Sequence, residues 1–80
     1  MDTEYTPISC AAHDELLALA TKRQRCELVV RGADGGTARL EGVIQDVYTS
    51  EGAEYLRLND GSVVRLDRLV SVDGRSVPAA

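Results

Sequence analysis

Apolar and polar residues follow two different periods along this chain, and the change between them separates a helix from a set of strands. Residues 10–25 are rich in good helix formers, and their apolar positions recur at helical spacing, so one face can pack on a sheet. Ser9 is the first candidate for the N-cap, and Asp14 is a second if the helix starts later. From Cys26 onward the period becomes two, which is typical of strands with one face in the core.

Turn-forming residues divide the rest of the chain into five predicted strands. The turns contain Asp-Gly, Gly-Gly or Glu-Gly pairs, which accept positive φ at little cost. The strands are expected near residues 26–31, 37–48, 54–58, 62–66 and 69–72. The second of them is long and contains Gly42, which suggests a bulge or a sharp bend. Asp67 lies at the corner before the fifth strand, where its carboxylate is expected to accept bonds from nearby backbone amides.

This order of elements predicts a mainly β protein, a small five-stranded SH3-like or Sm-like barrel preceded by one N-terminal α-helix. In 80 residues a two-layer sandwich would be short of strands, whereas a bent sheet that closes on itself buries its edges. The alternative is an open antiparallel sheet with the helix across one face. The chain reads as a single domain, 1–80, consisting of an extended arm (1–9), the helix (10–25), the β-barrel (26–73) and a loose tail (74–80).

The formal net charge of −4 is concentrated in the first quarter of the chain. Residues 1–21 contain no Lys or Arg and four acids, which are Asp2, Glu4, Asp14 and Glu15, whereas residues 22–80 contain nine acids and nine bases. Such a segment repels phosphates and suits a basic protein surface. The alternative for Asp14 and Glu15 is that acids gather at the start of a helix because of its dipole, although this does not explain Asp2 and Glu4.

Little in the sequence points to catalysis or metal binding, so no enzyme activity, cofactor or metal is expected. Cys10, His13 and Cys26 supply only three of the four ligands of a structural zinc site. Both cysteines are expected to be buried thiols, and His13 is expected near the helix start or on the surface. The chain has no apolar run long enough to span a membrane and no secretory signal, so a cytoplasmic location is expected.

The only aromatic residues are three tyrosines. Tyr55 could form a minimal platform for single-stranded RNA together with Arg57 and Arg65. The other interpretation is that Tyr48 and Tyr55 pack at strand ends with their hydroxyl groups in water. Tyr5 lies in a polar arm, where it either fixes the arm to the barrel or belongs to a binding surface.

The opening Tyr5-Thr6-Pro7-Ile8-Ser9-Cys10, followed by His13-Asp14 and a helix rich in Leu and Ala, resembles the start of the Rho-binding antiterminator (Rof) family. The resemblance continues through Glu54-Tyr55-Leu56 and through residues 65–71, and thus covers about residues 4–72. It implies an Sm-like barrel preceded by a helix, without catalytic activity. It also implies binding to the bacterial transcription termination factor Rho at its RNA-binding site, a basic, aromatic-lined cleft, and hence antitermination.

The resemblance assigns Asp14 as the best-matched acidic contact to Rho. Position and chemistry add Glu15, Glu4 and Tyr5 as partner-binding residues, with Glu54 as a weaker candidate on the barrel. The chain departs from the family pattern at three positions where the family usually carries acids, which are Ala11, Ala12 and Leu17. The expected partner is therefore the Rho protein rather than a nucleic acid or a membrane, and the protein itself is expected to be a monomer.

Overall fold

The computed structural model describes residues 4–80, which form one α-helix and a six-stranded antiparallel sheet. Asp2, one of the four acids in the predicted charge excess, lies outside the described residues. The elements are α1 (Cys10–Lys22), β1 (Arg25–Arg31), β2 (Thr37–Ser50), β3 (Ala53–Leu58), β4 (Val63–Arg65), the 3-10 helix η1 (Leu66–Arg68), β5 (Leu69–Val72) and β6 (Arg75–Ser76). The prediction of a mainly β protein behind an N-terminal helix is confirmed.

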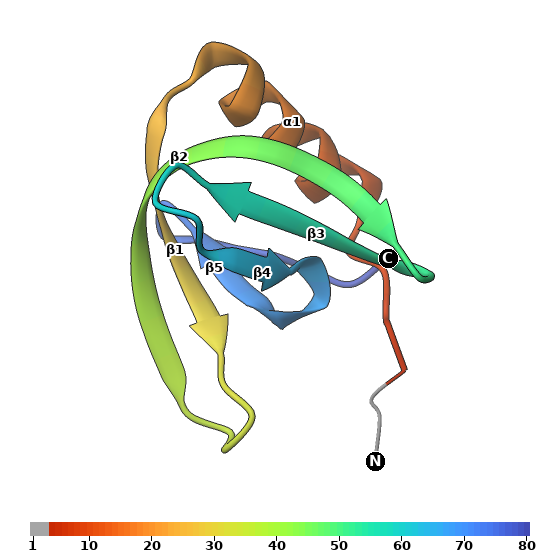
Figure 1. The fold of residues 1–80 in the computed structure, drawn as a ribbon. Coiled ribbons are helices and arrows are strands. Elements are labelled where there is room, and N and C mark those ends of the chain that lie inside the picture. Colours follow the sequence, from red (N-terminus) through yellow and green to blue (C-terminus); the bar gives the residue numbers. More distant parts are fainter. Residues whose placement is uncertain (1–3) are drawn as a thin grey trace.

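The long strand β2 joins the two halves of the sheet. Its first half, Thr37 to Val43, pairs with β1, and its second half, Ile44 to Ser50, pairs with β3. Figure 1 shows β2 as a continuous arc, with α1 lying along it. The strand order is β4-β3-β2-β1-β5-β6, so β4 and β6 are the two ends of the sheet.

The predicted count of five strands is wrong, because the short strand β6 adds a sixth beside β5. Within residues 4–80 no ladder joins β4 to β6, so the hydrogen-bonded sheet is bent but open. The physical reason is the shortness of β4, which has three residues before the chain turns into η1 and leaves the sheet. The arrangement is closer to the open antiparallel sheet that the sequence offered as the alternative.

Gly42 lies just before the point where β2 changes partner from β1 to β3, and the bulge lies further along the strand. The register of β2 against β3 shifts between Ile44 and Asp46, which leaves Gln45 as the extra residue. A Cβ atom at Gly42 would come within 2.7 Å of the side-chain oxygen of Asn59. A side chain at residue 42 would therefore displace the Asn59 side chain, whose Oδ1 accepts a hydrogen bond from the N–H of Val43.

The hydrophobic core lies between α1 and the sheet. From the helix it receives Ala12, Leu16 and Leu19, which recur at the spacing of one helix face. The largest fully buried side chains are Leu16, Leu28, Ile44, Leu56, Leu58 and Leu66. Burying each of them contributes roughly 1.5–3 kcal/mol, so this core dominates the stability of the fold.

The helix begins where the sequence predicts and ends earlier. Ser9 is the N-cap, and its Oγ accepts a hydrogen bond from the N–H of Ala12, which confirms the first of the two candidates. The predicted extension to residue 25 is wrong, because α1 ends at Lys22. Arg23 adopts a left-handed conformation with φ of 52°, which stops the helix, and β1 starts at Arg25.

The C-terminal segment 74–80 was predicted to be a loose tail, but it is hydrogen-bonded along its length. The N–H of Val77 donates to the carbonyl of Val70, beyond the β5–β6 pairing. The N–H of Ser9 donates to Pro78, and the N–H of Ala80 donates to Pro7. The end of the chain therefore lies beside the start of α1 (Figure 1), and it anchors the arm.

Candidate functional site

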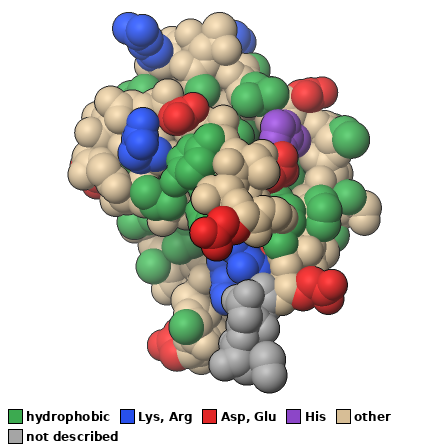
Figure 2. All heavy atoms as spheres, turned by 45° about the vertical axis from the view of Figure 1, so that its right-hand side comes forward, with side chains coloured by type: hydrophobic (Ala, Val, Ile, Leu, Met, Phe, Trp, Pro, Cys, Tyr) green, Lys and Arg blue, Asp and Glu red, His purple; other side chains and the backbone are tan. Residues whose placement is uncertain are grey.

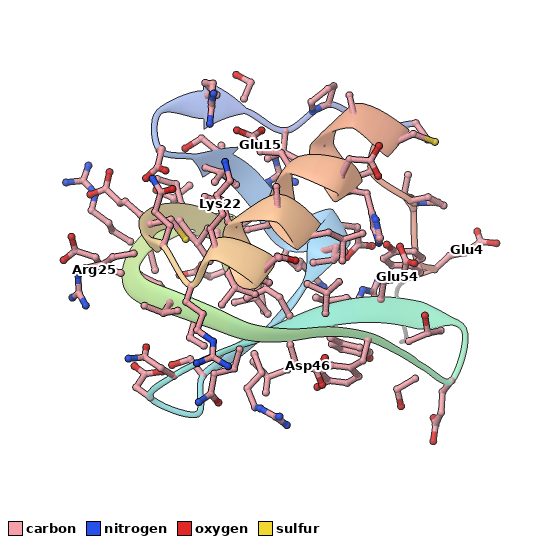
Figure 3. The ribbon with its side chains drawn as sticks, turned by 90° about the horizontal axis from the view of Figure 1, so that it is seen from above. Glu4, Glu15, Lys22, Arg25, Asp46 and Glu54 are labelled. Atoms are coloured by element: carbon pink, nitrogen blue, oxygen red, sulfur yellow. The ribbon has the colours of Figure 1, made fainter. Side chains whose placement is uncertain are left out.

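The acidic residues predicted to bind a partner lie toward the N-terminal end of α1. Figure 3 shows Glu4 and Glu54 on one side of the molecule and Lys22 and Arg25 on the other. These two acids are therefore distant from the basic end of α1, although Arg31, Arg65 and Arg68 lie beside the arm.

Tyr5 anchors the arm to the sheet, which decides between its two predicted roles in favour of the first. Its hydroxyl donates to Oε1 of Glu54 at 3.1 Å, and the guanidinium of Arg65 lies over its ring, 5.5 Å from the centroid. Burial, reinforced by the bond to Glu54, raises the pKa of Tyr5 to about 12. The phenol thus stays protonated and remains a donor to Glu54 at neutral pH.

Asp67 provides the second anchor of the arm. It forms a two-pronged ion pair with Arg65, in which Nε and Nη2 each donate to one carboxylate oxygen at 2.7 Å. The N–H of Thr6 donates to Oδ2 of the same carboxylate at 3.1 Å. The guanidinium of Arg65 lowers the pKa of Asp67. The sequence predicted that Asp67 accepts hydrogen bonds from nearby backbone amides. That prediction is wrong about the donor, because the amide belongs to Thr6 in the distant arm.

Glu54 is shared between the arm and the helix. Besides the Tyr5 hydroxyl, it contacts His13, whose Nε2 lies 3.5 Å from Oε2 of Glu54. His13 is accordingly on α1 and partly exposed, consistent with its prediction. In the space-filling view the single histidine lies on a face that carries both acidic and hydrophobic side chains (Figure 2). Because Glu54 already has two partners inside the protein, it is less available to a third.

Asp14 and Glu4 are the two predicted site residues whose carboxylates stay in water. Both residues are exposed, and neither carboxylate forms an ion pair or a hydrogen bond with another residue of the 4–80 segment. Glu15, by contrast, is half-buried and forms an ion pair with Arg75 of β6. The geometry therefore divides the predicted acids into two with free carboxylates and two with internal partners.

The dipole explanation for Asp14 and Glu15 is wrong for this helix. Because α1 begins at Cys10, its first turn contains no acidic residue, and both acids fall in the second turn. The favourable interaction with the helix dipole is confined to the first turn. The fold thus gives Asp14 neither a capping role nor an ion pair, and its charge is free for an external partner.

The two cysteines differ in exposure, so the prediction of two buried thiols is right only for Cys26. Cys10 is exposed at the first position of α1, whereas Cys26 is buried in β1. Burial raises the pKa of the Cys26 thiol. Among the described residues, no three His, Cys, Asp or Glu side chains are grouped as ligands of a metal ion would be. In the same part of the chain, no helix is long and apolar enough to cross a membrane.

The alternative RNA platform is only partly assembled. Tyr55 lies opposite Arg65 in the β3–β4 ladder, but it stacks on Tyr48, with ring centroids 5.6 Å apart. Arg65 is mostly covered and is engaged by Asp67. Arg57 is about half exposed, and the nearest oxygen of its partner Asp46 lies 3.9 Å away. Of the three predicted RNA-binding residues, only Arg57 therefore retains an accessible charged group.

Sequence reasoning missed the Arg65–Asp67 pair and the exposure of Leu17, whose side chain is one of two large hydrophobic ones left in water among residues 4–80. Leu17 lies one turn beyond Asp14 on α1. Their spacing alone could have indicated that Asp14 and Leu17 are neighbours, because residues three apart share a helix face. Arg65 and Asp67 are only two residues apart, but the hydrogen bond from Thr6 to Asp67 joins distant parts of the chain and has no signal in the sequence.

Comparisons of the chain with protein-family models, with curated proteins and with solved structures find no match. The resemblance to the Rho-binding antiterminator family therefore stays a prediction, and the candidate site rests on its geometry.

Proposed function

We propose that this protein is a non-catalytic inhibitor that binds the transcription termination factor Rho at its RNA-binding site and so opposes Rho-dependent termination. The contact is made by the acidic N-terminal surface, which consists of Glu4, Asp14 and the exposed part of Glu54. The observation that carries the proposal is Asp14, an exposed carboxylate on a rigid helix to which the fold gives no other task. The protein acts as a cytoplasmic monomer and needs no cofactor.

The anchored arm supports the proposal on energetic grounds. Tyr5 and Thr6 are held by Glu54 and Asp67, so the segment that carries Glu4 is ordered before any partner arrives. Ordering a binding segment in advance reduces the entropy lost on association. Carboxylates on such a surface attract a basic cleft over distance, which accelerates encounter and makes the interaction sensitive to salt.

Two further features bear on the proposal. The 3-10 helix η1 between β4 and β5, and the pairing of β5 with β1, are compatible with the resemblance, but the sheet formed by residues 4–80 is open and lacks the closure of the implied barrel. Glu15 and Glu54 are secondary contacts, because Arg75 engages the first, and Tyr5 and His13 engage the second. A partner must compete with those internal bonds before it can use either carboxylate.

Calorimetric titration of the protein into purified Rho, at low and high salt, tests the proposal. Wild type is expected to bind at low salt, and Asp14→Lys is expected to weaken binding at least about tenfold, because a repulsive charge replaces an attractive one. The control is Glu41→Lys, which changes the net charge equally but alters an exposed residue beside Arg25, on the opposite side from Glu4. Absence of binding at low salt, or equal effects of the two substitutions, would refute the proposal.

Direct RNA binding through Tyr55, Arg57 and Arg65 has less support. Asp67 occupies the guanidinium of Arg65 with two short hydrogen bonds, and the faces of Tyr48 and Tyr55 are stacked on each other. A base would have to displace one of these contacts before it could bind the platform.

A further inference from the structure

A groove of about 640 Å³ lies between the C-terminal end of α1 and the bend of β2, away from the acidic N-terminal surface. Its apolar floor is formed by Ala20 and Val43, with the buried core residue Ile44 behind them. Its polar lining consists of Arg23, Gln45, Arg57 and Asn59, and no carboxylate lines it. The smaller groove beneath the arm, of about 420 Å³, is lined by both acids and arginines. The larger groove therefore presents an excess of hydrogen-bond donors and positive charge.

Arg23 occupies a position that favours glycine. Its φ of 52° is left-handed, and the residue that ends a helix in this conformation is usually glycine, which has no Cβ to strain. Arg23 is exposed and forms no ion pair with any residue between positions 4 and 80. Glu51 and Asp73 share this conformation at turns, so the feature of Arg23 that bears on a ligand is its exposed guanidinium without an internal ion-pair partner.

Arg57 supplies a second positive charge to the groove. Among residues 4–80 its ion-pair partner is Asp46, whose oxygen lies 3.9 Å from Nη2, and both side chains are about half exposed. An exposed pair at this separation is weak. An anion that accepts two hydrogen bonds from the guanidinium therefore competes well against Asp46.

Asn59 adds a neutral donor whose orientation is fixed by the backbone of β2. The N–H of Asn59 donates to the carbonyl of Val43, and the N–H of Val43 donates to Oδ1 of Asn59. Because a backbone N–H needs an acceptor, the oxygen of this amide must face Val43. The Nδ2 amino group is left as a donor, and it has no acceptor among the described residues.

We propose that this groove binds a nucleotide, with its phosphate between Arg23 and Arg57 and its base against the apolar floor. Planar guanidinium groups suit phosphate oxygens, and the volume of the groove is within the usual range for small ligands. The negative end of the α1 dipole lies near this groove, but it repels an anion only weakly. The carbonyls of Leu19 and Ala20 already accept bonds from the N–H groups of Gln24 and Arg23. The nucleotide is either part of a single-stranded RNA or free.

The test measures fluorescence anisotropy of a labelled single-stranded RNA of about eight nucleotides at low and high salt. Unlabelled RNA, adenosine monophosphate and a polyglutamate peptide serve as competitors. Arg23→Gly is the main variant, since it removes the guanidinium and relieves the positive φ, so the fold is kept or stabilised. Arg57→Gln is the second variant. The control Arg39→Gln also removes one positive charge, but from an exposed residue of β2 outside the groove.

Wild type is expected to bind the RNA at low salt. Each groove variant should weaken binding at least about tenfold, whereas Arg39→Gln should change it by less than about twofold. Competition by adenosine monophosphate identifies the free nucleotide as ligand, and competition by RNA alone identifies the single strand. No binding of either at low salt, displacement by polyglutamate, or an equal effect of Arg39→Gln overturns the proposal. The groove is independent of Rho binding, because none of these substitutions alters the acidic N-terminal surface.

Discussion

The carboxylate of Asp67 links two parts of the chain that are far apart in sequence, the arm at residues 5–6 and the corner at residues 65–67. It holds Arg65 at the end of β4 and the backbone of Thr6 in the arm, and the Arg65 side chain covers the ring of Tyr5. Both members of the ion pair are largely removed from solvent, with 17% of Arg65 and 9% of Asp67 exposed. Asp67 therefore helps to fix the position of the arm, together with Glu54 and the C-terminal segment.

Asp67→Asn is expected to destabilise the protein by roughly 2–4 kcal/mol at neutral pH, because the guanidinium loses its charged partner in a covered site. The pKa of Asp67 is lowered in the folded protein. Its contribution is therefore complete above the ordinary carboxyl pKa of 3.8 and is lost as pH falls through the lower folded value.

Urea unfolding of wild type and Asp67→Asn at several pH values measures this effect. The difference between the two proteins should be constant from pH 7 to about pH 5 and should shrink below about pH 4. Asp34→Asn is a suitable control, because Asp34 is an exposed turn residue whose carboxylate bonds only to the nearby N–H of Gly36. A difference that persists unchanged into acid would contradict the role assigned to the Arg65–Asp67 pair.

Among the elements, the arm and the C-terminal segment depend on each other. Residues 4–9 and residues 77–80, beyond β6, form no strand of their own, but Ile8 and Ala79 form an antiparallel bridge. It is flanked by the hydrogen bonds from the N–H of Ser9 to Pro78 and from the N–H of Ala80 to Pro7. The arm leads directly into Ser9, the N-cap of α1, and the N–H of Ser9 donates to Pro78 of the C-terminal segment. The C-terminal residues thus support the start of the helix that carries Asp14.

Deletion of residues 78–80 is expected to lower the free energy of unfolding by about 1–3 kcal/mol, because two backbone hydrogen bonds are lost at about 0.5–1.5 kcal/mol each. Hydrogen exchange at the amides of Thr6 and Ser9 should accelerate. Ala79→Ser, which changes an exposed side chain and keeps the backbone, is expected to leave both unchanged. Unchanged exchange at Ser9 after the deletion would show that the tail does not hold the arm.

Local signals predicted the elements more accurately than their ends. Ser9 and the periodic apolar residues located the start of α1, and alternation with Asp-Gly turns located the strands. The end of the helix at Lys22 was missed because Arg23 adopts a left-handed conformation, which is not expected of an arginine from its residue type. The sixth strand was missed because a two-residue strand has no period of its own.

The molecule as a whole separates its proposed binding surfaces by charge. Asp14 and Arg23 are nine positions apart on the helix and its cap, which is about 13 Å along the axis. This distance exceeds the Debye length of about 8 Å at physiological salt, so the two surfaces should act independently.

The double variant Asp14→Lys, Arg23→Gly tests this independence. Arg23→Gly alone should leave Rho affinity within about twofold of wild type, and in the double variant the effects on each ligand should add within about 0.5 kcal/mol. Calorimetry with Rho and anisotropy with RNA, both at physiological salt, give the two affinities. Strong coupling between the substitutions would show that a single surface binds both partners.

The sequence by itself determined the features that depend on neighbouring residues, which are the helix with its Ser9 cap, the alternating strands, the glycine turns and the acidic first quarter. These follow from backbone preferences and periodicity that extend over a few residues. Only the tertiary structure decided which acids remain available. Glu54 is engaged by Tyr5 and Glu15 by Arg75, whereas Asp14 stays in water. Those pairings join residues about 50 or more positions apart, so they depend on how β2 bends and how the chain ends meet, which no local pattern encodes.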